Sequence, residues 1–417
     1  MDRTLSARGL SRRTLLSRLT LGLGSAALLP HLSARRALAA VGTKPTFLVV
    51  VNQFGGNDSM NTYVPYGLGA YHDARPRIGL ADEEVLPIVP GEGLHPSLAP
   101  IHPLWAAGDL AVVRQTGYPD PNLSHFESAD IWSRGVRDLG RTTDARGWIG
   151  RAADLHFPGA LDVVGLGVGR RPDFVADVAK PLALDGLSSY GPGDRAVPWW
   201  ELSHRDATAR AMLAAGSVAE TSPGKDLRRS LRNAYDLVDV VRQADEAYTS
   251  TVEYPDSSFA ARLRDVAKLV RADLGGRIFY TGLGGWDTHA DQAGWHAGLL
   301  SEVATSLDAF QRDLAAMGAW DRALVLVITE FGRRNYDNAS SGTDHGHGQN
   351  VLALGGALHG GVYGPAYTAS TITANEQIPG VVDFRAIYTN VLRAHLGVDP
   401  AGVFPETWSG DTEVPLF

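Results

Sequence analysis

The sequence predicts an α/β domain built on a mostly parallel central sheet with helices on both faces. Short continuous apolar runs, typical of strands buried on both sides, alternate with segments of helical apolar spacing. Such alternation favours a parallel sheet covered on both faces. The expected strands are residues 46–51, 110–114, 161–166, 277–283, 323–329 and 351–354. The expected helices are residues 259–274, 290–317 and 383–396, the last with Asp383 as its N-cap.

The composition limits the chemistry that the chain can use. Hydrophobic residues make up 44% and charged residues 20% of the 417 residues, as in ordinary soluble globular proteins. The chain has no cysteine, so any metal must be bound by imidazole, carboxylate or other oxygen ligands. The net charge of −8 argues against nonspecific binding of nucleic acid, and we expect no nucleic-acid partner.

Residues 1–39 have the layout of a secretory signal. A basic stretch is followed by an apolar run at residues 15–29 and by small residues, with cleavage expected after Ala39. The pair Arg12 and Arg13 matches the twin-arginine pattern. The apolar run is short for a membrane span, although an uncleaved membrane anchor is the alternative. We therefore predict export of the folded chain by the twin-arginine machinery, to the periplasm or the exterior.

Residues 40–417 are expected to form the mature domain. The stretch from about residue 167 to 254 breaks the alternation of strands and helices, because it is loop-rich and then helical and charged. We interpret this stretch as an insertion or cap on the main domain.

The first candidate site follows the first expected strand. In open parallel sheets, ligands bind beyond the carboxyl ends of the strands. Gly55 and Gly56 allow a sharp turn there, after which Asn57 and Asp58 offer oxygen ligands. An Asn-Asp turn or helix cap is the alternative.

Ser124 stands where a helical pattern begins. A hydroxyl at a helix N-terminus lies in positive potential, which favours an anionic substrate and a deprotonated nucleophile. The alternative is a capping box formed by Ser124 and Glu127.

Two further segments carry histidine and aspartate among glycines. Asp287 and His289 lie two residues apart after an expected strand, so both can bind one metal ion, although a helix cap beside a surface histidine would look the same. Asp344, His345 and His347 fall within six residues, a density that favours metal binding or acid–base chemistry.

Glu330 ends the most apolar expected strand of the chain. A carboxylate there is costly unless it is paired or bound to a metal. Arg333 is either its ion-pair partner or a clamp for an anion.

Together these motifs resemble a bacterial family called domain of unknown function 1501, over about residues 46–397. The motifs are GGND at 55–58, LHP at 94–96, GYP through NLSHF at 117–126, GWDTH at 285–289, EFGR at 330–333 and TDHG at 343–346. That family is itself similar to the alkaline phosphatase/sulfatase superfamily, which implies an alkaline phosphatase-like fold with a metal site at the strand ends.

The resemblance implies roles for particular residues. Asp58 or Asn57 would be the first ligand, Ser124 the nucleophile, and Glu330 would replace a strand-end aspartate. The Asp287–His289 spacing is shorter than the superfamily usually shows, and Phe331 stands where a second ion would need a histidine. The expected cofactor is a divalent ion (Zn, Mn, Mg or Ca), and its candidate ligands are Asp58, Asp287, His289, Glu330, His345 and His347.

These roles predict an exported metal-dependent hydrolase of phosphate or sulfate esters, whose substrate is a small anionic ester. Ser124 would attack, His125 or His347 would move protons, and Arg333 would hold the anion. One alternative is a non-catalytic metal-binding protein, with a partner protein in a surface assembly. Another is a sugar- or peptide-directed hydrolase that uses carboxylates only and survives chelation.

Overall fold

The computed structural model describes residues 44–191, 199–215, 222–405 and 414–417. Its main sheet has nine strands in the order β11-β5-β10-β9-β1-β8-β6-β7, and β12 also pairs with β5. The strands are β1 Phe47–Phe54, β5 Leu110–Gly117, β6 Val163–Leu166, β7 Leu182–Leu184, β8 Ile278–Gly284, β9 Ala323–Ile328, β10 Gln349–Leu354, β11 Gly361–Tyr363 and β12 Val382–Asp383.

All pairings in this sheet are parallel except those of β10, which runs antiparallel to β5 and β9. The prediction of a mostly parallel sheet is therefore confirmed, and each of the six expected strands is present. The antiparallel direction of β10 was not predicted, since an apolar run of this length does not reveal its direction.

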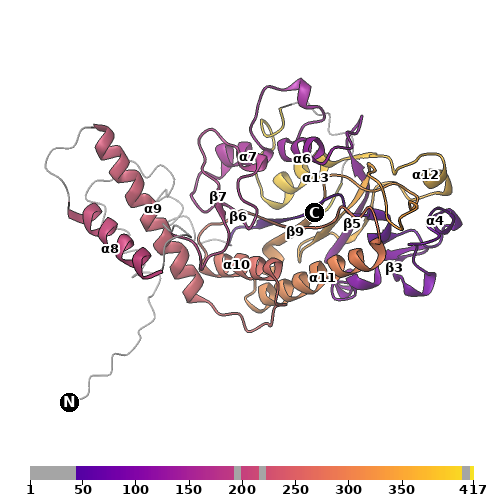
Figure 1. The fold of residues 1–417 in the computed structure, drawn as a ribbon, viewed down its shortest axis with the longest axis horizontal. Coiled ribbons are helices and arrows are strands. Elements are labelled where there is room, and N and C mark those ends of the chain that lie inside the picture. The colour runs from indigo at the N-terminus through magenta and orange to yellow at the C-terminus, as the bar shows by residue number, and fades with distance from the viewer. Residues whose placement is uncertain (1–43, 192–198, 216–221, 406–413) are drawn as a thin grey trace, which may run out of the picture. The chain divides into compact units, whose positions relative to one another are not determined.

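Helices cover both faces of the sheet, as predicted (Figure 1). Side chains of a strand alternate between its two sides. Val49 and Val51 of β1 therefore pack toward α10 (Ser258–Ala272) and α11 (Gln292–Ala316), while Leu48 and Val50 belong to the core on the opposite side. That second core is covered by α6 (His125–Arg134), α7 (Trp148–His156) and α13 (Phe384–Asn390).

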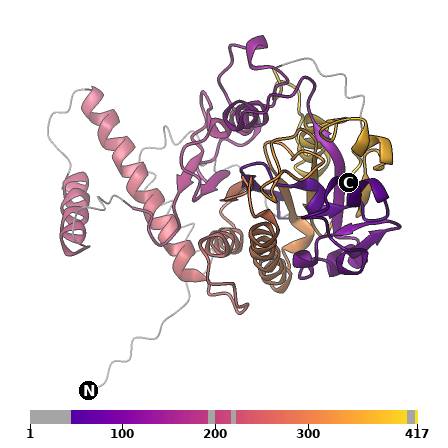
Figure 2. The same cartoon turned by 45° about the vertical axis from the view of Figure 1, so that its right-hand side comes forward.

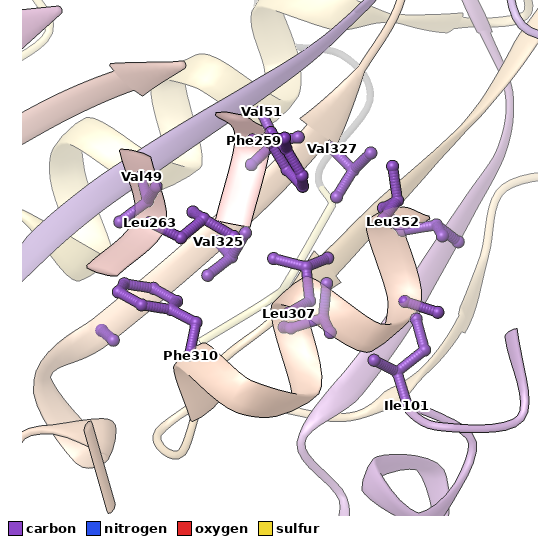
Figure 3. Packing of buried hydrophobic residues seen from close by; sticks show 14 of the residues in the cluster. Val49, Val51, Ile101, Phe259, Leu263, Leu307, Phe310, Val325, Val327 and Leu352 are labelled. Carbon is purple, nitrogen blue, oxygen red and sulfur yellow. The ribbon is translucent and has the colours of Figure 1, made fainter. Parts of the chain in front are cut away.

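Figure 3 shows the first core from close by, where Val49, Val51, Val325 and Val327 face the aromatic and aliphatic side chains of the covering helices. Full burial of each such side chain contributes about 1.5–3 kcal/mol relative to its exposure. Because β1 is buried on both faces, its sequence is a continuous apolar run instead of an alternating one.

A small sheet of order β2-β4-β3 and several short helices follow β1 before β5 begins. Together with the remaining short elements of the described chain, they connect the strands of the main sheet. These elements are α3 Ser59–Thr62, β2 Tyr63–Val64, α4 Gly69–Ala74, β3 Leu86–Val89, β4 Glu92–Leu94, α5 Pro103–Ala107, α12 Ala369–Thr373 and the π-helical turn Val391–His395.

The segment interpreted as an insertion contributes to the sheet and to its core. Within it, β7 pairs with β6 at the sheet edge. The segment also contains α8 (Trp199–Ala215) and α9 (Ser222–Ala247). Val241 and Ala244 of α9 are buried in the core beside α10, and Figure 2 shows the end of α9 next to that helix. Its role as a cap stays a prediction.

Within the described residues, no helix has both the length and the apolar character needed to cross a membrane. The predicted signal at residues 1–39 lies outside the described part of the chain.

Candidate metal centre

The topology brings five loops to one edge of the sheet. Strands β1, β5, β8 and β9 share one direction, so the loops after all four leave at their common carboxyl edge. Because β10 runs the opposite way, the segment that precedes it, residues 343–348, also reaches this edge. The motifs that the sequence analysis identified therefore converge.

Oδ1 of Asp287 is the centre of a cluster of three imidazoles. The Nε2 atom of His289 lies 3.0 Å from this oxygen, that of His345 lies 3.2 Å away, and that of His125 lies 3.4 Å away. Potential ligand atoms of His125, Asp287 and His345 all lie within 4.8 Å of one another. His289 joins this group, since its Nε2 lies 3.0 Å from that of His345.

Each imidazole of the cluster is oriented by a hydrogen bond from its other nitrogen. Nδ1 of His125 donates to Glu330 Oε1 at 2.7 Å. Nδ1 of His289 donates to Asp344 Oδ1 at 3.2 Å, and that of His345 donates to the carbonyl oxygen of residue 123 at 2.9 Å. Because these oxygens accept the Nδ1 protons, the three Nε2 lone pairs are left to face the centre of the cluster.

This arrangement fits a metal ion. Nε2 of His125 is buried and has no hydrogen-bond partner in the described structure. The Nε2 atoms of His289 and His345 face each other at 3.0 Å, and their two lone pairs repel unless a proton or a metal ion lies between them. Oδ1 of Asp287, which also accepts a hydrogen bond from Arg333, offers a negatively charged ligand beside the imidazoles.

Arg333 holds the loops of the site together. Its guanidinium is fully buried and pairs with Asp287 at 2.7 Å, so its ion-pair partner is not Glu330. All three guanidinium nitrogens donate to acceptors within the protein, which leaves Arg333 in a structural role instead of the expected contact with a substrate anion. The backbone acceptors are the carbonyl oxygens of Gly55, Gly56, Trp286 and Thr343.

The charges of the site keep Asp287 ionised. Partial burial raises the pKa of this carboxyl, but the hydrogen bond and charge of Arg333 and the nearby imidazoles outweigh burial and lower the pKa to about 2. The hydrogen bond to Glu330 raises the pKa of His125 against the opposing effect of burial. Burial lowers the pKa of His345, which favours the neutral form that binds metals.

Glu330 contacts the cluster through His125. Its side chain is buried and accepts hydrogen bonds from the backbone N–H of Gly55 at 2.9 Å and from the hydroxyl of Thr329 at 3.2 Å, besides the one from His125. Glu330 therefore orients His125 through its Nδ1 and lies outside the group of Nε2 atoms that face Asp287. The expectation that Glu330 is a metal ligand is corrected accordingly.

Asp58 is not brought to the cluster. It is 1% exposed, caps α3, and accepts hydrogen bonds from Arg75 and from Gln292, each at 2.5 Å. Burial raises the pKa of Asp58, but the charge and hydrogen bond of Arg75 reverse this effect and lower it. The expectation that Asp58 is the first ligand is therefore corrected, because its charge is neutralised by a buried ion pair. Asn57 is buried in the same network, with its side-chain oxygen 2.8 Å from His296 Nε2.

His347 also lies away from the cluster. Its ring packs against Gly117 and Gly380. A Cβ added to Gly117 would lie 2.8 Å from the ring, and one added to Gly380 would lie 2.6 Å from it. The ring nitrogens face the backbone N–H groups of Tyr118 and Gly380. Burial lowers the pKa of His347 to about 4. This position corrects the expectation that His347 binds metal or transfers protons at the site.

Ser124 is exposed at the N-cap of α6, and its side chain forms no capping hydrogen bond. The capping box with Glu127 is therefore absent. The carbonyl of the preceding residue, Leu123, accepts from His345, and the following residue is His125, so Ser124 lies at the rim of the cluster.

Gln292 is a connecting residue that the sequence did not reveal. It is fully buried, and its Nε2 donates to Asp58. Its Oε1 accepts from the hydroxyl of Thr288 at 3.0 Å and from that of Thr343 at 2.6 Å. Thr288 and Thr343 lie close to the residues of the cluster in the sequence, so Gln292 links the two segments that carry it. A polar residue in the first turn of a helix does not indicate this linking role in the sequence.

An open pocket of about 480 Å³ lies beside the cluster. Its wall includes the cluster residues Asp287 and His289 together with Gly285, Thr288, Ala290 and Trp295.

The fold and the site define an α/β protein with a histidine-rich candidate metal centre at the strand ends. The family described as protein of unknown function (DUF1501) matches residues 112–412, and the chain belongs to this family. No curated protein matches the sequence.

Several solved structures resemble the chain. A protein of the alkaline phosphatase superfamily from Vibrio parahaemolyticus is 11% identical with a TM-score of 0.37, over 88% of this chain and 71% of that one. The lipoteichoic acid synthase LtaP from Listeria monocytogenes is 10% identical with a TM-score of 0.38, over 87% and 74%. Alkaline phosphatase from the Antarctic bacterium TAB5 is 11% identical with a TM-score of 0.32, over 80% and 97%. Similarity at this level does not bear on activity, which must follow from the chain's own residues.

Proposed function

We propose that the chain is an exported metal-dependent hydrolase of phosphate or sulfate esters that uses one divalent ion. The observation that carries this proposal is the convergence of three imidazole Nε2 atoms on Asp287 Oδ1, each imidazole being oriented through its Nδ1. Three imidazoles beside one carboxylate suit zinc better than magnesium, calcium or manganese, which prefer oxygen ligands.

His125, Asp287, His289 and His345 would hold the ion. When bound, the ion supplies charge that lowers the pKa of an attacking hydroxyl and stabilises the ester oxygens. Glu330 keeps the proton on His125 Nδ1, and Arg333 keeps Asp287 ionised.

Ser124 is the proposed nucleophile. It lies at the start of a ten-residue helix, whose free N–H groups favour the negative charge of a phosphate or sulfate group.

The proposal of export depends on residues 1–39, whose paired arginines, apolar run and small-residue end match a twin-arginine signal. The implied partners are the twin-arginine machinery and a small anionic ester.

A second candidate function is metal binding without catalysis, with a partner protein in a surface assembly. The contacts of Arg333 favour this second function. Its guanidinium, which the sequence analysis predicts to hold an anion, donates to backbone carbonyls and to Asp287 instead, so it is not free to bind a substrate.

Metal analysis and turnover of the exported, purified protein test these proposals together. The enzyme should contain about one ion per chain and hydrolyse an aryl phosphate or an aryl sulfate. Chelation should abolish that turnover. Ser124→Ala should lose turnover and keep the metal, because Ser124 contributes no ligand.

The other outcomes separate the alternatives. Metal without turnover of either ester favours the binding protein, and turnover that survives chelation favours a hydrolase that uses carboxylates only. A chain that neither binds metal nor hydrolyses either ester contradicts the main proposal.

A further inference from the structure

The pocket beside the cluster contains an exposed tryptophan. Trp295 lies in the first turn of α11 and is 62% exposed, the second most exposed of the large hydrophobic side chains in the described residues. The exposed face of the indole offers a large flat apolar surface on which a ligand ring can stack. Because Trp295 lines a pocket that also contains Asp287 and His289, a substrate bound at the cluster can cover the indole.

The indole is held in a fixed position. Its Nε1 donates to the carbonyl oxygen of Gly285 at 2.8 Å. Gly285 adopts a φ of +99°, and a Cβ there would lie 3.5 Å from Nε1 and 3.7 Å from Leu299. The positive φ, and not crowding, requires glycine at this position, and the hydrogen bond joins the indole to the loop that carries Asp287 and His289.

Several polar groups of the pocket wall already have partners. The Thr288 hydroxyl donates to Gln292, the Gly285 carbonyl accepts from Trp295, and His289 and Oδ1 of Asp287 belong to the cluster. Among the described residues that line the pocket, none is a lysine or an arginine. Apart from Oδ2 of Asp287, a ring rich in hydroxyl groups would find few partners here, whereas a flat apolar ring needs none.

We infer that the substrate carries an aromatic ring on the alcohol side of its ester, and that this ring stacks on Trp295 while the anionic group lies at the cluster. This inference depends on the proposed function, since it specifies the substrate of that same site. Stacking of aromatic rings, together with the apolar area that it buries, corresponds to about tenfold in affinity.

Binding of unreactive anions tests this inference without requiring turnover. Calorimetry on the metal-loaded full chain would compare phenylphosphonate with methylphosphonate, and benzenesulfonate with methanesulfonate. We expect the aromatic member to bind about tenfold more tightly in at least one pair. Trp295→Ala should lose this preference and still bind the small anion, whereas Trp295→Phe should retain most of it.

The controls separate a local effect from misfolding. Leu155→Ala removes another exposed apolar side chain, on α7, and should keep the preference. Metal content and the unfolding temperature should match in all variants. Equal binding of both members of each pair, or a preference that survives in Trp295→Ala, overturns the inference and leaves the proposed function standing. Failure of all four anions to bind metal-loaded protein overturns both.

Discussion

The Nε2 atoms of His289 and His345 lie 3.0 Å apart. Both rings donate from Nδ1 to a fixed oxygen, so neither ring has a proton on the facing nitrogen in its neutral form. Two lone pairs at this distance repel, and the carboxylate of Asp287 lies beside both nitrogens. A divalent metal ion beside these nitrogens would relieve the repulsion and bind both imidazoles and the carboxylate, as the proposed function requires.

We first predict that His289→Ala and His345→Ala both abolish retention of metal, because each removes a nitrogen from the cluster. Affinity for zinc should fall by about 100-fold or more, which titration against a chromophoric chelator measures. His359→Ala is the matched control, since His359 is an exposed histidine beyond the far end of β10. Normal metal content in either cluster variant would remove that residue from the site.

Glu330→Gln should weaken metal binding by about tenfold while the chain stays folded. The amide oxygen can still accept the proton of His125 Nδ1, but it lacks the charge that makes the imidazole a stronger ligand. Glu376→Gln, at an exposed glutamate paired with Arg334, should leave the affinity unchanged. Equal affinity in Glu330→Gln and in the unmodified chain would argue against an orienting role for Glu330.

Gln292→Met should lower the free energy of unfolding by about 3 kcal/mol. The substitution removes the acceptor of two buried threonine hydroxyls and a donor to Asp58. Gln311→Met, at a half-buried position of the same helix, should change stability by only about 0.5 kcal/mol. Chemical denaturation measures both values, and similar losses in the two variants would show that the Gln292 network is unimportant.

Acid should destabilise the protein through its buried histidines. Burial lowers the pKa of His296 to about 3 and that of His395 to about 4. Unfolded histidine has a pKa of about 6.5, so the unfolded chain binds more protons as the pH falls below that value. Each residue therefore contributes stability that is fully present above about pH 6.5 and is lost toward pH 3–4, with a slope of about 1.4 kcal/mol per pH unit.

Denaturant midpoints measured from pH 7 to pH 4.5 test this dependence. His395→Gln should make the slope shallower, and His359→Gln, at the exposed histidine, should not. A free energy of unfolding that stays constant over this range would contradict the assignment of neutral buried imidazoles.

Much of the fold could be predicted from the sequence, because strands buried on both faces have continuous apolar runs. Strands such as β7 and β12 could not be found, since two or three residues carry no periodicity. Glycine-rich turns after the strands also indicated the edge at which the site lies. The strand directions explain why residues 285–289 and 343–346 meet at this edge, because β8 ends there and β10 begins there.

The roles of individual residues at the site were harder to predict. Asp58 follows a strand just as Asp287 does, but Arg75 and Gln292 surround it in the folded chain, and no spacing in the sequence reveals these neighbours. His347 lies two residues from His345, yet it fills the space beside two distant glycines. Arg333 contacts four backbone carbonyls, which a search for side-chain motifs does not detect.

X-ray absorption spectroscopy at the metal edge of the purified, exported protein would show whether the histidines of the cluster bind the ion. We expect about one ion per chain, with imidazole scattering from at least two histidines and a carboxylate oxygen, and loss of part of the imidazole signal in His345→Ala. A chain that carries no ion, or an ion without imidazole ligands, would contradict this expectation.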